Sequence, residues 1–174
     1  MKKLFEGLEE NDIVVTGNGS ACVVSFQAAE IKKGQRLFTN SGCASMGYGL
    51  PAALGACIAE GEKRVICLDG DGSLMMNLQE LQTIRYNNCN MKLFVLNNNG
   101  YHSIRQTQNN LFKNGLVGVC DGNGVNFPPF DKLADTFGFR YFKIDSLDGI
   151  EEKLQEVLNT DGPVPVSYTH LTLP

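Results

Sequence analysis

Two short polar motifs follow apolar runs of strand length and carry residues suited to binding phosphate and a metal ion. Asp69-Gly70-Asp71-Gly72-Ser73 follows the run at 64–68, and Asn97-Asn98 follows the run at 91–96. Glycine lets a backbone approach phosphate closely, and a helix behind it offers free N–H groups and its positive dipole end. A carboxylate at such a place repels phosphate unless a cation lies between them. Asp71 therefore predicts a divalent metal that bridges protein and phosphate.

The asparagine motif supplies neutral oxygen donors for the same ion. If the two runs are neighbouring parallel strands, their carboxyl ends meet at one edge of the sheet, where α/β proteins bind ligands. One carboxylate, one amide oxygen, one main-chain carbonyl and diphosphate oxygens together form a hard octahedral site. We therefore expect Mg²⁺ as the metal.

Two further glycine-containing turns stand before expected helices. Thr16-Gly17-Asn18-Gly19-Ser20 follows the first apolar run and is typical of a phosphate-contacting turn. The stretch 41–56 is a glycine-rich turn that opens a helix of small residues. Taken alone, this second turn is equally well explained as the entry to a closely packed helix.

The elements that must position these motifs alternate along the chain. Continuous rather than alternating hydrophobicity indicates strands buried on both faces, hence a parallel sheet. We expect strands at 13–16, 36–39, 64–68, 91–96 and 139–144, and helices at 21–30, 47–60, 76–88, 102–112, 130–137 and 148–159. Asn77 stands where it would cap the third helix, and 113–129 is the longest irregular loop. The predicted fold class is α/β, a three-layer doubly wound, mostly parallel sheet.

Composition excludes several classes of protein. The 174 residues suit one domain, and the net charge of −4 predicts no nucleic-acid partner. No apolar run approaches the roughly 18 residues of a membrane span, and charges near Met1 exclude a signal peptide. Six cysteines without a CxxC pair are typical of reduced core residues, so we expect a cytoplasmic protein.

The last residues differ in character from the rest. Val166-Ser167-Tyr168-Thr169-His170-Leu171 matches one reading frame of a common sequencing-library transposon end. We therefore expect residues 1–165 to form the domain and 166–174 to be a non-native, adapter-derived tail.

The two polar motifs together resemble the signature of enzymes that bind thiamine diphosphate. The flanking stretches 73–81 and 99–106 are similar to those of acetolactate synthase and its relatives, and the likeness covers residues 10–165. The resemblance implies thiamine diphosphate and Mg²⁺ as cofactors. It also implies that Asp71, the Asn98 side chain and the Gly100 carbonyl hold the metal.

The resemblance further implies how the cofactor is bound. The Ala44 carbonyl and the Met46 N–H would hold the aminopyrimidine ring, and the Met46 side chain would bend the cofactor into a V. The V brings the cofactor's own imino nitrogen near the reacting carbon. The remaining expected cofactor contacts are Asn18, Gly19, Ser20, Gly70, Gly72, Ser73, Met76, Tyr101 and His102. Relatives often carry Gln-His in place of Ser20-Ala21, so we expect main-chain contacts there.

No catalytic residue is expected in this chain itself. In the family, the activating glutamate comes from the pyrimidine-binding domain of another subunit, so we expect a homodimer or homotetramer when complete and an inactive fragment alone. The substrate implied is a 2-keto acid, with decarboxylation and carboligation as the chemistry. His102 and Thr107 stand where acetolactate synthases have Gly and Trp, which favours a different acceptor or simple decarboxylation.

Three alternatives stay open at this point. The first is the corresponding half of a phosphonopyruvate- or sulfopyruvate-type decarboxylase. The second is a non-catalytic cofactor-binding module. The third, a nicotinamide dinucleotide domain, fits poorly because no G-x-G-x-x-G opens the first helix.

Overall fold

The fold is built on one twisted parallel sheet. The computed structural model describes residues 1–61, 63–112 and 115–169. The six strands, all paired in parallel, lie in the order β2-β1-β3-β4-β6-β5. They are β1 (Ile13–Thr16), β2 (Arg36–Thr39), β3 (Val65–Gly70), β4 (Met91–Asn97), β5 (Phe142–Ile144) and β6 (Val164–Thr169).

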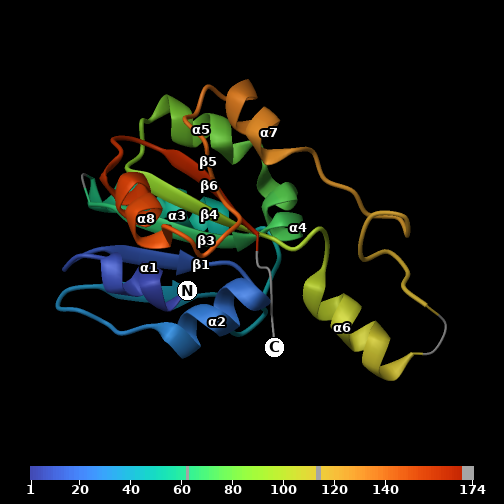
Figure 1. Ribbon diagram of the computed structural model, residues 1–174. Coiled ribbons are helices and arrows are strands. Elements are labelled where there is room, and N and C mark those ends of the chain that lie inside the picture. The colour runs from blue at the N-terminus through green and yellow to red at the C-terminus, as the bar shows by residue number, and fades with distance from the viewer. Residues whose placement is uncertain (62, 113–114, 170–174) are drawn as a thin grey trace.

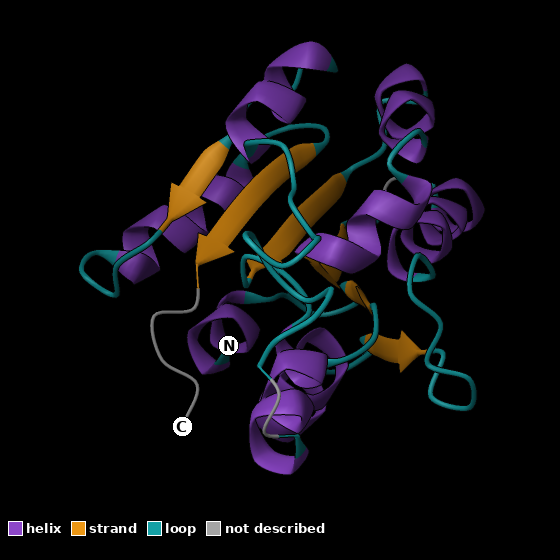
Figure 2. Ribbon diagram, turned by 90° about the vertical axis from the view of Figure 1, so that its right-hand side faces the viewer, coloured by secondary structure: helices purple, strands orange, loops and turns teal. Residues whose placement is uncertain are grey.

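Helices cover both faces of this sheet and complete three layers (Figure 1, Figure 2). One buried cluster joins the sheet to α3 (Gly49–Glu60), α5 (Glu80–Tyr86) and α7 (Phe130–Thr136). A second cluster joins the other face to α1 (Lys2–Gly7), α2 (Ser20–Ala28) and α8 (Ile150–Asn159). The predicted α/β class and doubly wound architecture are therefore confirmed. The apolar runs of the inner strands β1, β3 and β4 are buried because these strands pack against helices on both sides, whereas the edge strands β2 and β5 are only partly buried.

The strand order reverses direction between β1 and β3. From β1 the chain first adds β2 on one side and then β3, β4 and β6 on the other. Ligands of open α/β sheets bind beyond the carboxyl ends of the strands at such a switch point. The turn at 17–20 leaves β1 there and the turn at 70–72 leaves β3, so the topology brings two predicted binding turns together.

Several boundaries differ from the sequence-based expectation. The helix expected at 76–88 is shorter, since α5 starts only at Glu80, and it is preceded by α4 (Asp71–Leu74) and a 3₁₀ turn η1 (Met75–Asn77). Asn77 is not a cap, because α5 begins after Gln79 and has no side-chain cap. The strand expected at 139–144 starts only at Phe142, and the short helix α1 was not predicted.

The final strand β6 includes residues that we assigned to the tail. Val166 and Ser167 are buried, and β6 pairs with both β4 and β5. The boundary at residue 165 therefore falls inside the sheet, because Val166 fills an apolar position between its two neighbours. Residues 170–174 lie outside the described residues, and the adapter origin of the tail stays a prediction.

Helix α6 (His102–Leu111) extends away from the three layers (Figure 1). None of its residues is buried. The described part of the following loop, 115–129, contains one isolated bridge, between Gly100 and Cys120, and no helix or strand. No described helix has the length and apolar character needed to cross a membrane.

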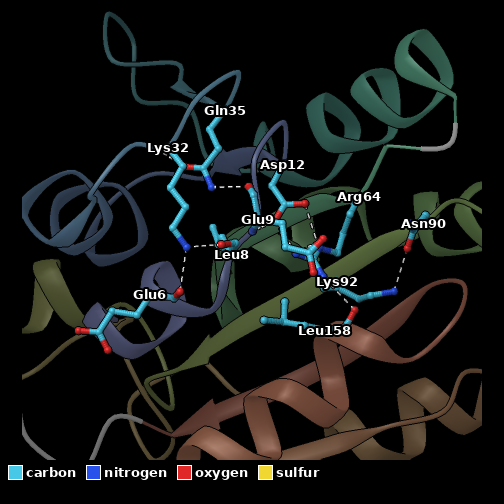
Figure 3. A network of polar contacts seen from close by, with 10 residues as sticks. All are labelled: Glu6, Leu8, Glu9, Asp12, Lys32, Gln35, Arg64, Asn90, Lys92 and Leu158. Atoms are coloured by element: carbon cyan, nitrogen blue, oxygen red, sulfur yellow. Dashed lines mark hydrogen bonds and ion pairs between the residues drawn. The ribbon is translucent and has the colours of Figure 1, made fainter.

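A polar network ties the chain together at the amino ends of the strands (Figure 3). Arg64 makes two hydrogen bonds to the buried Asp12 carboxylate, at 3.0 and 2.6 Å. The Lys92 side chain is fully buried and donates to Asn90 Oδ1 and to the carbonyls of Thr160 and Gly162. Burial lowers the pKa of Lys92 to about 8. This network lies at the opposite end of the strands from the binding turns, so its role is structural.

Candidate functional site

A cavity at the carboxyl ends of the strands gathers most of the predicted site residues. It is lined by Asn18, Gly19, Ser20, Met46, Gly70, Asp71, Gly72, Ser73, Asn98, Gly100, Tyr101, His102, Ser103 and Ile104. Of the predicted residues, Ala44 and Met76 do not line it, and Ser103 and Ile104 are additional. Its volume is about 90 Å³, whereas small-molecule sites usually measure about 300–1,000 Å³. A cavity of this size is too small to enclose a typical small-molecule ligand by itself.

Asp71 is the organising residue of this cavity. It begins α4, and its carboxylate is 1% exposed. Oδ1 accepts the N–H of Gly72 at 2.8 Å, and Oδ2 accepts the N–H groups of Asn98 at 2.9 Å and Gly100 at 3.0 Å. Burial raises the pKa of Asp71, and these three N–H groups act in the opposite direction.

The donor set around Asp71 fits a hard divalent cation. The Asn98 side-chain amide, half-buried at the cavity wall, makes no hydrogen bond to the described residues. No three histidine, cysteine, aspartate or glutamate side chains cluster as a metal site in the described part of the chain. A cation here would therefore rely on one carboxylate, neutral oxygens and a bound anion. That combination suits Mg²⁺ with a diphosphate.

The turn at 97–100 is held from both sides. While Asp71 accepts its N–H groups, Arg105 of α6 donates to the carbonyls of Asn98 at 2.9 Å and Asn99 at 3.4 Å. Asn99 adopts a left-handed backbone with φ +52°. The turn is therefore fixed by charged groups at both its donors and its acceptors, which are the stronger kind of hydrogen bond.

Tyr101 closes one end of the cavity. Its ring lies so near Gly72 that a Cβ there would be 2.2 Å from Tyr101 Cε1. Its other side meets Phe127 edge to face, with ring centroids 6.1 Å apart. A side chain at position 72 would therefore overlap the Tyr101 ring unless that ring moved.

The turn at 44–47 borders the same cavity through Met46. Met46 is 39% exposed and the neighbouring Met76 is 48% exposed. Ala44 has a left-handed φ of +49° and lies exposed at the surface. These apolar groups form an open rim beside the cavity rather than part of its floor.

His102 and Thr107 are placed differently from each other. His102 opens α6 and lines the cavity. Thr107 is exposed, donates its hydroxyl to the Ser103 carbonyl at 3.0 Å, and does not line the cavity formed by the described residues. Of these two residues, only His102 lines this cavity, and the role of both in the choice of acceptor stays a prediction.

Asp69 was not singled out by the sequence analysis. Its side chain is fully buried, and Oδ2 has no hydrogen-bond partner among the described residues. Burial raises the pKa of Asp69 to about 6, against the effect of the Ser73 hydroxyl and the Gly70 N–H. The carboxylate packs where a Cβ on Gly17 or Gly49 would overlap it. The repeated Asp-Gly in 69–72 was the only signal that could have identified it.

Comparison with known proteins identifies the class of this domain. The model of the thiamine pyrophosphate enzyme C-terminal TPP binding domain matches residues 17–168. The chain belongs to this family, and its cofactor is thiamine diphosphate, also called thiamine pyrophosphate. The cavity lies within the matched residues, at the edge of the sheet where the topology predicts a ligand.

Three acetolactate synthases illustrate the similarity. The chain is 31% identical to the isozyme 1 large subunit of Escherichia coli (strain K12) over 156 residues, which cover 90% of this chain and 27% of that subunit. It is 33% identical to the isozyme 2 large subunit of the same organism, over 94% of this chain and 29% of the relative. It is 34% identical to the mitochondrial catalytic subunit of Aspergillus candidus, over 94% and 23%. The chain thus spans about a quarter of the length of these relatives.

Proposed function

We propose that the chain is the diphosphate- and Mg²⁺-binding part of an acetolactate synthase-like enzyme that decarboxylates a 2-keto acid and joins the product to a second carbonyl compound. The observation that carries the proposal is the Asp71 carboxylate beside Asn98 and Gly100 at the switch point of the sheet. The names of the relatives support the reaction class.

Three residues would hold the metal. Asp71 supplies the carboxylate, Asn98 its side-chain oxygen and Gly100 its carbonyl. The buried N–H groups around Asp71 keep its oxygens fixed, so a cation meets a rigid ligand rather than a mobile one. The Mg²⁺ in turn neutralises the diphosphate close to this carboxylate.

The remaining cavity residues would bind and orient the cofactor. The residues proposed to face the diphosphate are Asn18, Gly19 and Ser20, which follow β1, and Gly70, Gly72 and Ser73 at the end of β3. Tyr101 and His102 close the same side. Ala44, Met46 and Met76 form the rim for the aminopyrimidine ring. The bound thiamine diphosphate supplies the electron sink, and the protein supplies orientation, metal and electrostatics.

A second domain would cover the open side of the site. The cavity is small, Met46 and Met76 are exposed, and α6 has no buried residue. This chain alone would therefore leave part of a bound cofactor uncovered. We assign that cover to the pyrimidine-binding domain of another subunit, in a homodimer or homotetramer. We also propose a cytoplasmic location, to which the six free cysteines are suited.

The phosphonopyruvate- or sulfopyruvate-type decarboxylase is the second candidate. His102 at the cavity wall favours it, because an imidazole adds a hydrogen-bond donor for a polar or anionic substrate group. A non-catalytic module remains the third candidate.

Two experiments separate these functions. Calorimetric titration of the chain tests cofactor choice: we expect saturable binding of thiamine diphosphate with Mg²⁺ and none of a nicotinamide dinucleotide, and the reverse preference would refute the family role. Product analysis on the complete enzyme then tests the reaction. 2-Acetolactate from pyruvate supports the synthase, an aldehyde from phosphonopyruvate or sulfopyruvate supports the decarboxylase, and no turnover supports the module.

A further inference from the structure

The peptide of Gly47 is held at both its N–H and its carbonyl by side chains from the segment that follows β3. The Ser73 hydroxyl accepts the Gly47 N–H at 2.9 Å. Asn77 Nδ2 donates to the Gly47 carbonyl at 2.7 Å. Gly47 directly follows Met46, so these two bonds fix the end of the turn that carries the apolar rim.

Local geometry shows that this contact is specific. Gly47 has a left-handed φ of +79°, and a Cβ on it would lie 2.7 Å from Met76 Cβ and 2.9 Å from Asn77 Nδ2. Any other residue at position 47 would push the turn away from the 71–77 segment. The glycine therefore permits the close approach that both hydrogen bonds need.

A buried carboxylate supports the arrangement from behind. Ser73 is 3% exposed, and its hydroxyl is near enough to the Asp69 carboxylate to favour the charged form of that group. A serine hydroxyl that donates to Asp69 keeps its oxygen free to accept from Gly47. Asp69, Ser73 and Asn77 thus lie behind the turn that carries Met46.

The residues from 71 to 77 consequently serve two ends of one site. Asp71 and Gly72 face the metal-binding turn at Asn98. Asn77 instead bonds to the Gly47 carbonyl, in the turn that carries Met46. The helix cap expected at Asn77 is absent, so its side chain is available for this contact.

We propose that Asn77, together with Ser73, is a positioning residue that presets the turn at 44–47 for the ring end of the cofactor. This role rests on the proposed function, and in it different residues hold the two ends of the cofactor. Asp71 governs the diphosphate and metal, whereas Asn77 governs the aminopyrimidine end without touching the diphosphate.

Two probes that share the diphosphate but differ in the ring test this division. Thiamine diphosphate and inorganic pyrophosphate, each with Mg²⁺, are titrated into the ¹⁵N-labelled chain and followed by NMR. The variant is Asn77→Ala, which removes the donor and leaves the net charge unchanged. Asn87→Ala is the matched control, because Asn87 Nδ2 also donates to a backbone carbonyl, that of Thr83 at 2.8 Å, away from the site.

We expect Asn77→Ala to lose about fivefold or more in affinity for thiamine diphosphate, the order of one lost hydrogen bond. Its affinity for pyrophosphate stays within about twofold of the unmodified chain, which also shows that the variant is folded. Hydrogen exchange at the Gly47 amide becomes faster, and Asn87→Ala changes none of these quantities.

The contrary results are distinct. An unchanged affinity for thiamine diphosphate, or an equal loss for both probes, overturns the role of Asn77. If the unmodified chain binds neither probe with Mg²⁺, the proposed function itself fails.

Discussion

Asp71 Oδ2 accepts the backbone N–H of Asn98 at 2.9 Å, although 27 positions separate the two residues in the sequence. The contact joins the ends of β3 and β4, which pair in parallel from Val65 and Met91 to Gly70 and Leu96. The Asp71 carboxylate thus holds the backbone of the turn, while the Asn98 side-chain amide is the group proposed to bind the metal. The same residue organises the apo fold and the proposed metal site.

The first prediction concerns this dual role. Asp71→Ala leaves the N–H groups of Gly72, Asn98 and Gly100 without their acceptor in a buried place. We expect the free energy of unfolding to fall by about 1–3 kcal/mol, measured by urea denaturation without cofactor. Asp135→Ala, at an exposed carboxylate of α7, is the control. Equal stability of the two variants would show that Asp71 is not structural.

The second prediction concerns Lys92 and pH. Its pKa falls from 10.5 to about 8 on folding, because the side chain is buried. Below pH 8 the lysine is charged in both states and the full cost of burying the charge is present. Between pH 8 and 10.5 only the folded state releases its proton, so stability rises with pH through this window.

Lys92→Met removes this titration. The unfolding free energy of the natural chain, minus that of the variant, should therefore increase by about 1–3 kcal/mol between pH 7.5 and 10. Chemical denaturation across this range measures the difference, in which the titrations of other groups cancel. A difference that stays flat or falls with pH would mean that Lys92 is not buried as a charge.

Much of the fold could be predicted because its strands carry unambiguous patterns. Val65–Gly70 and Met91–Asn97 are buried almost throughout, and their apolar runs predicted both strands. The polar residues at their ends then located the site. Lys92 shows the limit of this reasoning, since a lysine inside an apolar run gives no sign that two carbonyls about 70 positions away, those of Thr160 and Gly162, accept its hydrogen bonds.

The roles of Asp69 and Asn77 were beyond sequence reasoning for a related cause. Both act through tertiary contacts with the turn around Gly47 and Gly49, which only folding brings near. Asn77 was expected to cap a helix, a local role, yet its side chain bonds instead to Gly47, 30 positions earlier. The local sequence indicates which side chains can form hydrogen bonds, and tertiary packing decides which groups become their partners.

The third prediction concerns association of the isolated chain. The rim and α6 expose Met46, Met76, Ile104, Leu111 and Phe112. Exposed apolar side chains beside a binding site favour association, so we expect concentration-dependent self-association in sedimentation velocity. Replacing Leu111 and Phe112 by serine should reduce it, whereas Tyr86→Ser, at an 84% exposed residue of α5, should not. A monomer at all concentrations would contradict the proposed cover.

The fourth prediction concerns Arg105. Arg105→Gln removes the guanidinium that holds the Asn98 and Asn99 carbonyls from α6. We expect Mg²⁺-dependent binding of thiamine diphosphate to weaken by about 3- to 30-fold, because charged hydrogen bonds to the turn are lost. Arg140→Gln, at an exposed ion pair with Glu156, is the calorimetric control. An unchanged affinity would mean that Asp71 holds the turn without help from Arg105.

The assignment of Asp71 as the metal ligand is tested most directly by calorimetry. Thiamine diphosphate is titrated, with and without Mg²⁺, into the natural chain and into Asp71→Asn. The substitution removes the negative charge and keeps the size of the side chain. We expect Mg²⁺-dependent binding to the natural chain and to an Asp135→Asn control, and loss of the Mg²⁺ dependence in Asp71→Asn. Equal, Mg²⁺-dependent affinity in all three proteins would contradict the assignment of Asp71 as the metal ligand.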